Sequence, residues 1–230
     1  TKKQWGRDPT DIPGSILTRL PLRFDYNDNY FEHPYQGMPK GGYSQVIANI
    51  LDHPKIKITL GHHFKRIDAK GYAHTVFSGP LDEFFEYQFG RLPYRTLTFE
   101  KHVTSGDFQG ISVMNYCDQD IPYTRISEHK FFAPWESHSQ SIYFKEYSKE
   151  CKPGDIPYYP VKLSEGSKLL TMYQAAAKTE KNVTFVGRLG TFKYLDMDKT
   201  IFEAMVGVPL WALAHLKLDG EGLPGDSAAN

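Results

Sequence analysis

Cysteine is scarce in this chain, with only Cys117 and Cys151 among 230 residues. Two cysteines cannot form the disulfide framework of a small secreted domain, so a reducing cytoplasmic location is the expectation. Neither cysteine stands in a spacing typical of zinc, and the adjacent His62 and His63 would point to opposite faces of a strand. The sequence therefore predicts no metal site.

The chain also lacks an excess of either charge and any long apolar run. Lysine and arginine together number 27, and so do aspartate and glutamate. A neutral chain has no general attraction for nucleic acid or anionic lipid. No apolar stretch approaches the ~20 residues that a membrane-spanning helix requires. The sequence thus predicts neither a nucleic-acid partner nor insertion into a membrane.

Aromatic residues, by contrast, are abundant, with 15 Tyr, 15 Phe and 3 Trp. Such side chains can fill a core or build flat pockets for sugars and bases, and composition leaves this choice open. Hydrophobic periodicity and turn residues predict a mixed α/β (α+β) chain whose consecutive central strands form an antiparallel meander. The expected helices are 15–20, one after Lys40-Gly41-Gly42, 167–178 and 196–206, and the expected strands are 56–60, 74–80, 95–103, 110–116, 123–132, 141–147 and 182–187.

Two glycine-containing segments are candidates for binding a phosphate. Gly220-Glu-Gly-Leu-Pro-Gly225 matches the dinucleotide fingerprint, but no strand precedes it and no helix follows, so it is interpreted as a flexible tail. Segment 186–198 has the better context, because an expected strand ends at Gly187 and a helix begins near Asp196. A helix N-terminus favours an anionic ligand. An ordinary strand-to-helix connection capped by aspartate is the alternative.

Arginines beside aromatic residues form a second group of candidates. Arg19, Arg95 and Arg125 each lie near turns or tyrosines, and Tyr158-Tyr159 adds two hydroxyl groups. Arginine offers a fixed fork of donors that suits a diphosphate, although surface ion pairs are the more frequent role. No Ser-His-Asp or Cys-His arrangement is recognisable, so no side-chain nucleophile is predicted.

Twelve short segments occur in the order found in bacterial UDP-galactopyranose mutases, and residues 1 to about 212 closely resemble that family. The segments are Lys3-Gln-Trp-Gly6, Arg19-Leu-Pro-Leu-Arg23, Asp28-Asn-Tyr-Phe31, Tyr35-Gln-Gly-Met-Pro39, Gly41-Gly-Tyr43, Ser78-Gly-Pro-Leu-Asp82, Pro93-Tyr-Arg95, Phe108-Gln-Gly110, Pro122-Tyr-Thr-Arg125, Glu128-His-Lys130, Gly154-Asp-Ile-Pro-Tyr-Tyr-Pro160 and Gly187-Arg-Leu-Gly-Thr-Phe-Lys-Tyr-Leu-Asp-Met-Asp198.

The resemblance implies a flavoprotein isomerase that interconverts UDP-galactopyranose and UDP-galactofuranose for cell-surface polysaccharides. It implies reduced FAD as cofactor, with flavin N5 bonding covalently to the anomeric carbon while UDP leaves. It also assigns residues. Catalytic roles fall to Arg19 on a mobile loop and to Arg125. Substrate binding falls to Trp5, Tyr30, Arg95, Asn115, Tyr159 and Tyr194. Cofactor binding falls to Gly79, Pro80, Gly187, Arg188, Asp196 and Met197.

The resemblance further divides the chain. Residues 1–55 would be a helical substrate-binding segment with the mobile loop, 56–82 strands returning to the FAD domain, and 83–165 an antiparallel sheet. Residues 166–215 would complete a partial, Rossmann-like FAD-binding domain, and 216–230 a flexible tail. A homo-oligomer is possible, as in many family members.

The family's first third, with its true FAD fingerprint, has no counterpart here. We therefore expect a fragment that binds FAD weakly or not at all and is inactive alone. Two alternatives remain open. One is a non-catalytic UDP-sugar-binding module without flavin, and the other is a glycan oxidase of the same fold.

Overall fold

The computed structural model describes residues 2–6, 8–11, 24–27, 29, 33–161 and 164–215. Helix and strand are mixed along the chain, which confirms the predicted fold class. The described residues divide into two compact units, 1–64 with 93–167 and 65–92 with 168–230. The predicted helix 15–20, the residues Arg19 and Tyr30, and the glycine-rich segment 220–225 all lie outside the described residues.

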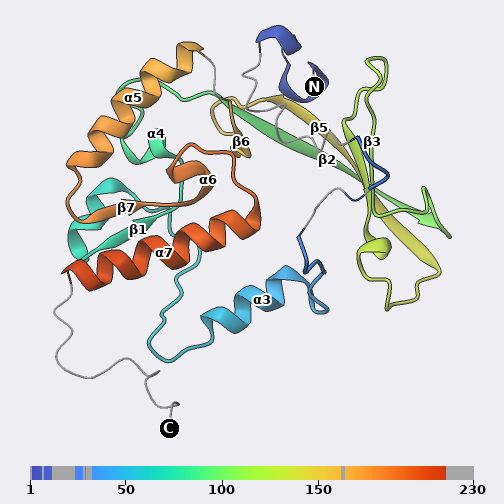
Figure 1. Ribbon diagram of the computed structural model, residues 1–230, viewed down its shortest axis with the longest axis horizontal. Coiled ribbons are helices and arrows are strands. Elements are labelled where there is room, and N and C mark those ends of the chain that lie inside the picture. Colours follow the sequence, from blue (N-terminus) through green and yellow to red (C-terminus); the bar gives the residue numbers. More distant parts are fainter. Residues whose placement is uncertain are drawn as a thin grey trace. The chain divides into compact units, whose positions relative to one another are not determined.

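The first unit is built around a five-stranded antiparallel sheet in the order β3-β4-β5-β2-β6 (Figure 1). Consecutive strands β3, β4 and β5 form a meander, but β2 lies between β5 and β6 instead of beside β3. The predicted meander is thus correct only in part. The elements of this unit are α1 (Lys2–Trp5), η1 (Pro9–Asp11), α3 (Gly42–Leu51), β2 (Tyr94–Ser105), β3 (Val113–Asn115), β4 (Arg125–Glu128), η3 (His129–Phe132), β5 (Gln140–Glu150) and β6 (Tyr159–Pro160).

The second unit contains a two-stranded parallel sheet, which Figure 1 draws between α5 and α7. Its core is aromatic: the Phe84 ring lies 4.9 Å from the rings of Phe77 and Phe185, and Tyr173 is fully buried. Here phenylalanines do fill a core. The elements are η2 (Arg66–Gly71), β1 (Thr75–Phe77), α4 (Leu81–Phe84), α5 (Ser164–Thr179), β7 (Val183–Phe185), α6 (Gly187–Gly190) and α7 (Met197–His215), of which α5 begins in the residues assigned to the first unit.

The strand predicted over residues 56–60 is absent, and within 56–82 only β1 (Thr75–Phe77) is a strand. Ile56, Ile58 and Leu60 lie in irregular backbone, and Leu60 is 88% exposed. Alternation predicts a strand only where a neighbouring strand supplies hydrogen bonds, and this segment pairs with no described strand. Among the helices of the described residues, none is long and apolar enough to cross a membrane.

Candidate functional site

One face of the five-stranded sheet carries three of the predicted substrate residues and one of the two predicted catalytic arginines. Asn115 pairs with Arg125 in the β3–β4 ladder, and Arg125 pairs with Glu146 in the β4–β5 ladder. Arg95 pairs with Tyr159 on one side and with Glu150 on the other. Ladder partners share a face, and Glu146 and Glu150 are separated by an even number of residues. Asn115, Arg125, Arg95 and Tyr159 therefore all belong to the same face.

The short helix α1 is fastened to this face and brings Trp5 with it. The carbonyl of Gln4 accepts hydrogen bonds from Ser148 Oγ at 2.7 Å and from Arg95 Nε at 3.0 Å. Lys3 Nζ donates to the carbonyl of Tyr116 at 2.7 Å, next to Asn115. Trp5 is 7% exposed. The first unit thus brings together all five predicted substrate and catalytic residues that the structure describes in it.

Arg95 is itself held by the backbone around α1. Gly6 has φ +65°, and a Cβ built on it would lie 2.9 Å from Arg95 Nη1. The left-handed φ favours glycine here, and a side chain would displace the Arg95 guanidinium from its position. Burial lowers the pKa of Arg95 from its usual value, and the nearby Glu150 acts in the opposite direction. Arginine stays charged under such shifts, so Arg95 is a fixed cation on this face.

Arg95 and Arg125 lie at different places along the face. Their partners on β5 are Glu150 and Glu146, so the two arginines are offset by four residues, or about 14 Å along the strand. The side chain of Arg95 reaches Ser148 Oγ at 3.2 Å, two residues from Glu146, so this backbone offset does not set the distance between the two guanidinium groups.

Part of the opposite face is covered by aromatic packing around Tyr143. Tyr143 stacks between His102 and Phe108, at ring distances of 4.9 and 3.8 Å. Glu128 is fully buried, and its carboxylate accepts backbone N–H bonds from Phe108, Gln109 and Gly110 at 2.7–3.1 Å. Burial alone would raise the pKa of Glu128, but hydrogen bonding outweighs it and the pKa is lowered. This carboxylate stabilises the loop after β2 and takes no part in the candidate site.

In the second unit, the predicted cofactor residues gather at the carboxyl ends of β1 and β7. The N–H of Val186 donates to the carbonyl of Phe77 at 2.9 Å, which joins the two strand ends. Gly187 has φ +71°, and a Cβ there would come within 3.8 Å of Ser78 and 3.9 Å of Thr200 in α7. Segments 78–80 and 186–188 and the first turn of α7 therefore converge. Ligands of open parallel sheets bind at such strand ends.

Arg188 and Tyr194 connect α6 to the start of α7. The Arg188 guanidinium donates to the carbonyl of Leu195 from Nε at 3.2 Å and Nη2 at 2.5 Å, and lies 4.7 Å from the centre of the Tyr194 ring. The carbonyl of Asp196 accepts the N–H and the hydroxyl of Thr200, which closes the first turn of α7. Met197, the first residue of α7, is 60% exposed. The N-terminus of this 19-residue helix thus forms one wall of the convergence.

These residues fit a flavin. Gly187 adopts a left-handed φ that turns the chain from β7 into α6, and α7 offers the N–H groups and positive dipole end that suit an anionic edge of the ring. Among the described residues, no group of three or more His, Cys, Asp or Glu could hold a metal ion.

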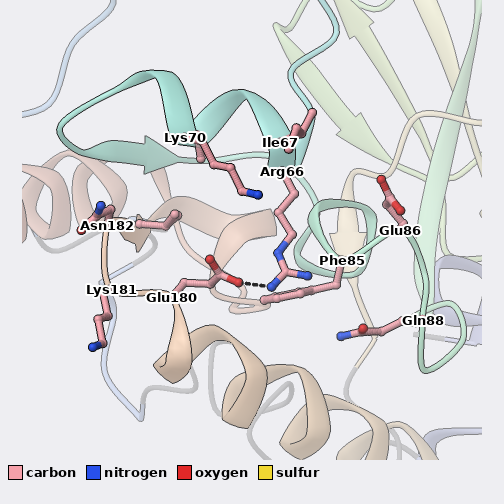
Figure 2. A pocket seen from close by; sticks show the side chains of 11 residues that line it. Arg66, Ile67, Lys70, Phe85, Glu86, Gln88, Glu180, Lys181 and Asn182 are labelled. Carbon is pink, nitrogen blue, oxygen red and sulfur yellow. Dashed lines mark hydrogen bonds and ion pairs between the residues drawn. The ribbon is translucent and has the colours of Figure 1, made fainter.

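A cavity of the second unit lies at the other end of the two strands. It has a volume of about 640 Å³ and is lined by η2, Phe85 and the residues just before β7. Figure 2 shows the Arg66 guanidinium over the Phe85 ring, at 5.1 Å, and in an ion pair with Glu180. None of the predicted site residues lines it.

Sequence reasoning missed Gln4, Glu146 and Ser148. Each contacts a predicted residue through a long-range pairing, so local spacing gave no signal for them. The even separation of Glu146, Ser148 and Glu150 on an alternating strand is the pattern that could have placed them on one face.

Known proteins are similar to this chain over most of its length. A probable UDP-galactopyranose mutase of Klebsiella pneumoniae is 57% identical over 205 residues, which cover 89% of this chain and 53% of that protein. A dTDP-fucopyranose mutase of Escherichia coli is 51% identical over 211 residues, which cover 89% of this chain and 56% of that protein. The chain thus spans about half the length of these curated relatives.

A crystal structure of reduced UDP-galactopyranose mutase shares the fold. It has a TM-score of 0.51 at 13% identity, over 65% of this chain and 46% of that one. The model of one protein family, UDP-galactopyranose mutase, matches residues 1–194. The chain therefore belongs to the UDP-galactopyranose mutase family, a family of isomerases.

Proposed function

We propose that this chain supplies the nucleotide-sugar site of an enzyme that interconverts UDP-galactopyranose and UDP-galactofuranose with reduced FAD. The observation that carries the proposal is the shared sheet face, on which two arginines, an asparagine and a tyrosine lie beside a buried tryptophan. Membership of the family supports the same assignment.

Arg125 would bind the diphosphate and stabilise the charge that develops when UDP leaves the sugar. A guanidinium is suited to this because its fork of donors matches phosphate oxygens. Arg19, which lies outside the described residues, would close over the same diphosphate. Tyr159 and Tyr194 would donate hydrogen bonds to the phosphates, Trp5 and Asn115 would line the sugar pocket, and Tyr30 would stack on uracil.

Reduced flavin, when bound, supplies the N5 nucleophile that forms the covalent bond to the anomeric carbon. Gly79, Pro80, Gly187 and Arg188 would hold its ring, with Asp196 and Met197 at the start of α7. The chain's part in the chemistry is to orient the ring and exclude water. A cytoplasmic location, a role in cell-surface glycans and a homo-oligomeric state stay predictions from the family resemblance.

The test has two measurements on the chain. Binding of UDP is measured by calorimetry, and turnover is measured by chromatography of UDP-galactofuranose incubated with chemically reduced FAD. Conversion with reduced but not oxidised FAD supports the isomerase. Because the chain is expected to bind FAD weakly or not at all, binding of UDP without conversion supports the nucleotide-sugar site that the isomerase and the UDP-sugar-binding module share, and no binding of UDP contradicts both.

The nucleotide specificity needs its own comparison, because one relative at 51% identity is named dTDP-fucopyranose mutase. Parallel titrations with UDP and dTDP decide between a uracil and a thymine site. The proposal expects tighter binding of UDP.

A further inference from the structure

The guanidinium of Arg125 is held from both neighbouring strands. Asn115 on β3 accepts a hydrogen bond from Arg125 Nε at 3.0 Å, and Glu146 Oε2 on β5 lies 3.7 Å from Arg125 Nη1. Both residues are the direct ladder partners of Arg125. The holding groups thus come from rigid strands on either side and not from a loop.

Glu146 is the more deeply buried member of the ion pair. The side chain of Glu146 is 11% exposed, against 35% for that of Arg125. The backbone of Glu146 is fixed as well, because its carbonyl accepts the N–H of Thr124 at 2.8 Å and the Thr124 hydroxyl at 3.0 Å. The same hydroxyl lies 3.4 Å from Glu146 Oε1. The carboxylate is therefore an anchor toward which the arginine is drawn.

This arrangement uses one side of the arginine fork and leaves the rest available. Nε and Nη1 face Asn115 and Glu146, whereas no described residue bonds to Nη2. A carboxylate beside an anion-binding arginine reduces the attraction of the arginine for the anion. It gives a benefit in return only if it fixes the direction of the remaining donors.

We propose that Glu146 is a positioning residue that orients Arg125, so that its free donors meet the diphosphate of the nucleotide. The inference rests on the proposed function for the ligand, but the orientation itself belongs to the free protein. Glu146 acts through Arg125 and does not touch the substrate.

The change in UDP affinity expected for Glu146→Gln is opposite in sign to that of a simple charge effect. Removing a carboxylate near an anion relieves repulsion, so on charge alone Glu146→Gln would tighten UDP binding whatever stands at residue 125. If Glu146 orients Arg125, the same substitution weakens binding when the arginine is present. Once Arg125→Met has removed the guanidinium, only the relief of repulsion is left.

The experiment is a double-mutant cycle on the whole chain, with UDP and uridine as probes. We expect Glu146→Gln to weaken UDP binding about fivefold, a size common for contacting residues that are coupled. In the Arg125→Met background, it should leave binding unchanged or tighten it. Uridine, which lacks the diphosphate, should bind with the same affinity to the wild type, the two single variants and the double variant. Tighter UDP binding by the single variant, or the same change in both backgrounds, overturns the proposal.

A second measurement needs no ligand. The exchange of the Arg125 Nε–H with water, followed by NMR, should become about fivefold faster in Glu146→Gln, and an unchanged rate overturns the proposal. Glu100→Gln is the matched control, because Glu100 pairs with Lys145 on the opposite face of the same sheet and accepts a hydrogen bond from Tyr147 at 2.7 Å. A wild-type chain that binds no UDP contradicts the proposed function, while the exchange rate still decides the orientation of Arg125.

Discussion

Arg95 Nε donates a hydrogen bond to the carbonyl of Gln4 at 3.0 Å, across a sequence separation of 91 residues. The same carbonyl accepts the hydroxyl of Ser148, so one backbone oxygen fixes helix α1 to two strands. Trp5 follows Gln4 directly. A side chain predicted to bind substrate is therefore also the one that holds the tryptophan in place.

Gly6→Ala tests this connection. The new Cβ would lie 2.9 Å from Arg95 Nη1 at a φ of +65°, so either the arginine or α1 must move. We expect UDP affinity to fall about tenfold, the equivalent of losing one charge-assisted hydrogen bond. Calorimetric titration of UDP is the measurement. The control is Gly71→Ala, where a Cβ meets nothing within 4 Å, and equal affinities in both variants would contradict the connection.

Glu128→Gln should lower stability in a pH-dependent way. The carboxylate accepts three backbone N–H bonds and its pKa is lowered in the folded chain, so its stabilisation is present above the unfolded pKa near 4.5. It is lost as the pH falls through the folded pKa. At pH 7 we expect a loss of about 2 kcal/mol in the free energy of unfolding.

Urea unfolding between pH 3 and pH 7 measures this effect. The wild-type midpoint should fall on acidification more steeply than that of Glu128→Gln, so the two curves converge at low pH. Asp118→Asn serves as the control, since this aspartate is exposed and only its backbone carbonyl makes a described hydrogen bond. Parallel pH curves for wild type and Glu128→Gln would refute the account.

A pair of glycine substitutions tests the packing that supports the candidate flavin site. A Cβ on Gly190 would lie 2.8 Å from the carbonyl oxygen of Phe77, so Gly190→Ala forces α6 away from the end of β1. Overpacking of this kind costs about 1–3 kcal/mol. Gly207→Ala in α7 meets nothing within 4 Å and should instead stabilise the helix by about 0.5–1 kcal/mol. The unfolding temperature should therefore fall in Gly190→Ala and rise in Gly207→Ala. If it rose in both variants, α6 would not be tightly packed against the end of β1.

Much of the fold followed from local signals in the sequence. Alternation predicted β2 and β5 to within a few residues, and Lys40-Gly41-Gly42 marked the start of α3. The prediction failed at residues 56–60, because three alternating apolar residues indicate a strand only if a partner strand lies beside them. The place of β2 between β5 and β6 was also not predictable, since strand order depends on pairings far apart in the sequence.

The candidate site was predictable only in its residue types. Spacing alone predicted a strand that ends near Gly187 and a helix that begins near Asp196, and it left open whether they bind a phosphate or form an ordinary connection; the structure brings these elements together. The roles of Arg95 and Arg125 came instead from the family resemblance. Their contacts with Gln4 and Glu146 depend on the register of the sheet, which one sequence does not specify.

The central claim is that the sheet face bearing Arg125 binds the diphosphate of a UDP-sugar. Calorimetric titration of the chain with UDP and with uridine, repeated on Arg125→Met, tests it most directly. The account predicts that UDP binds more tightly than uridine. Arg125→Met should lower the affinity for UDP about tenfold or more and leave the affinity for uridine unchanged. An equal loss of affinity for both ligands, or no loss of affinity for either, would contradict it.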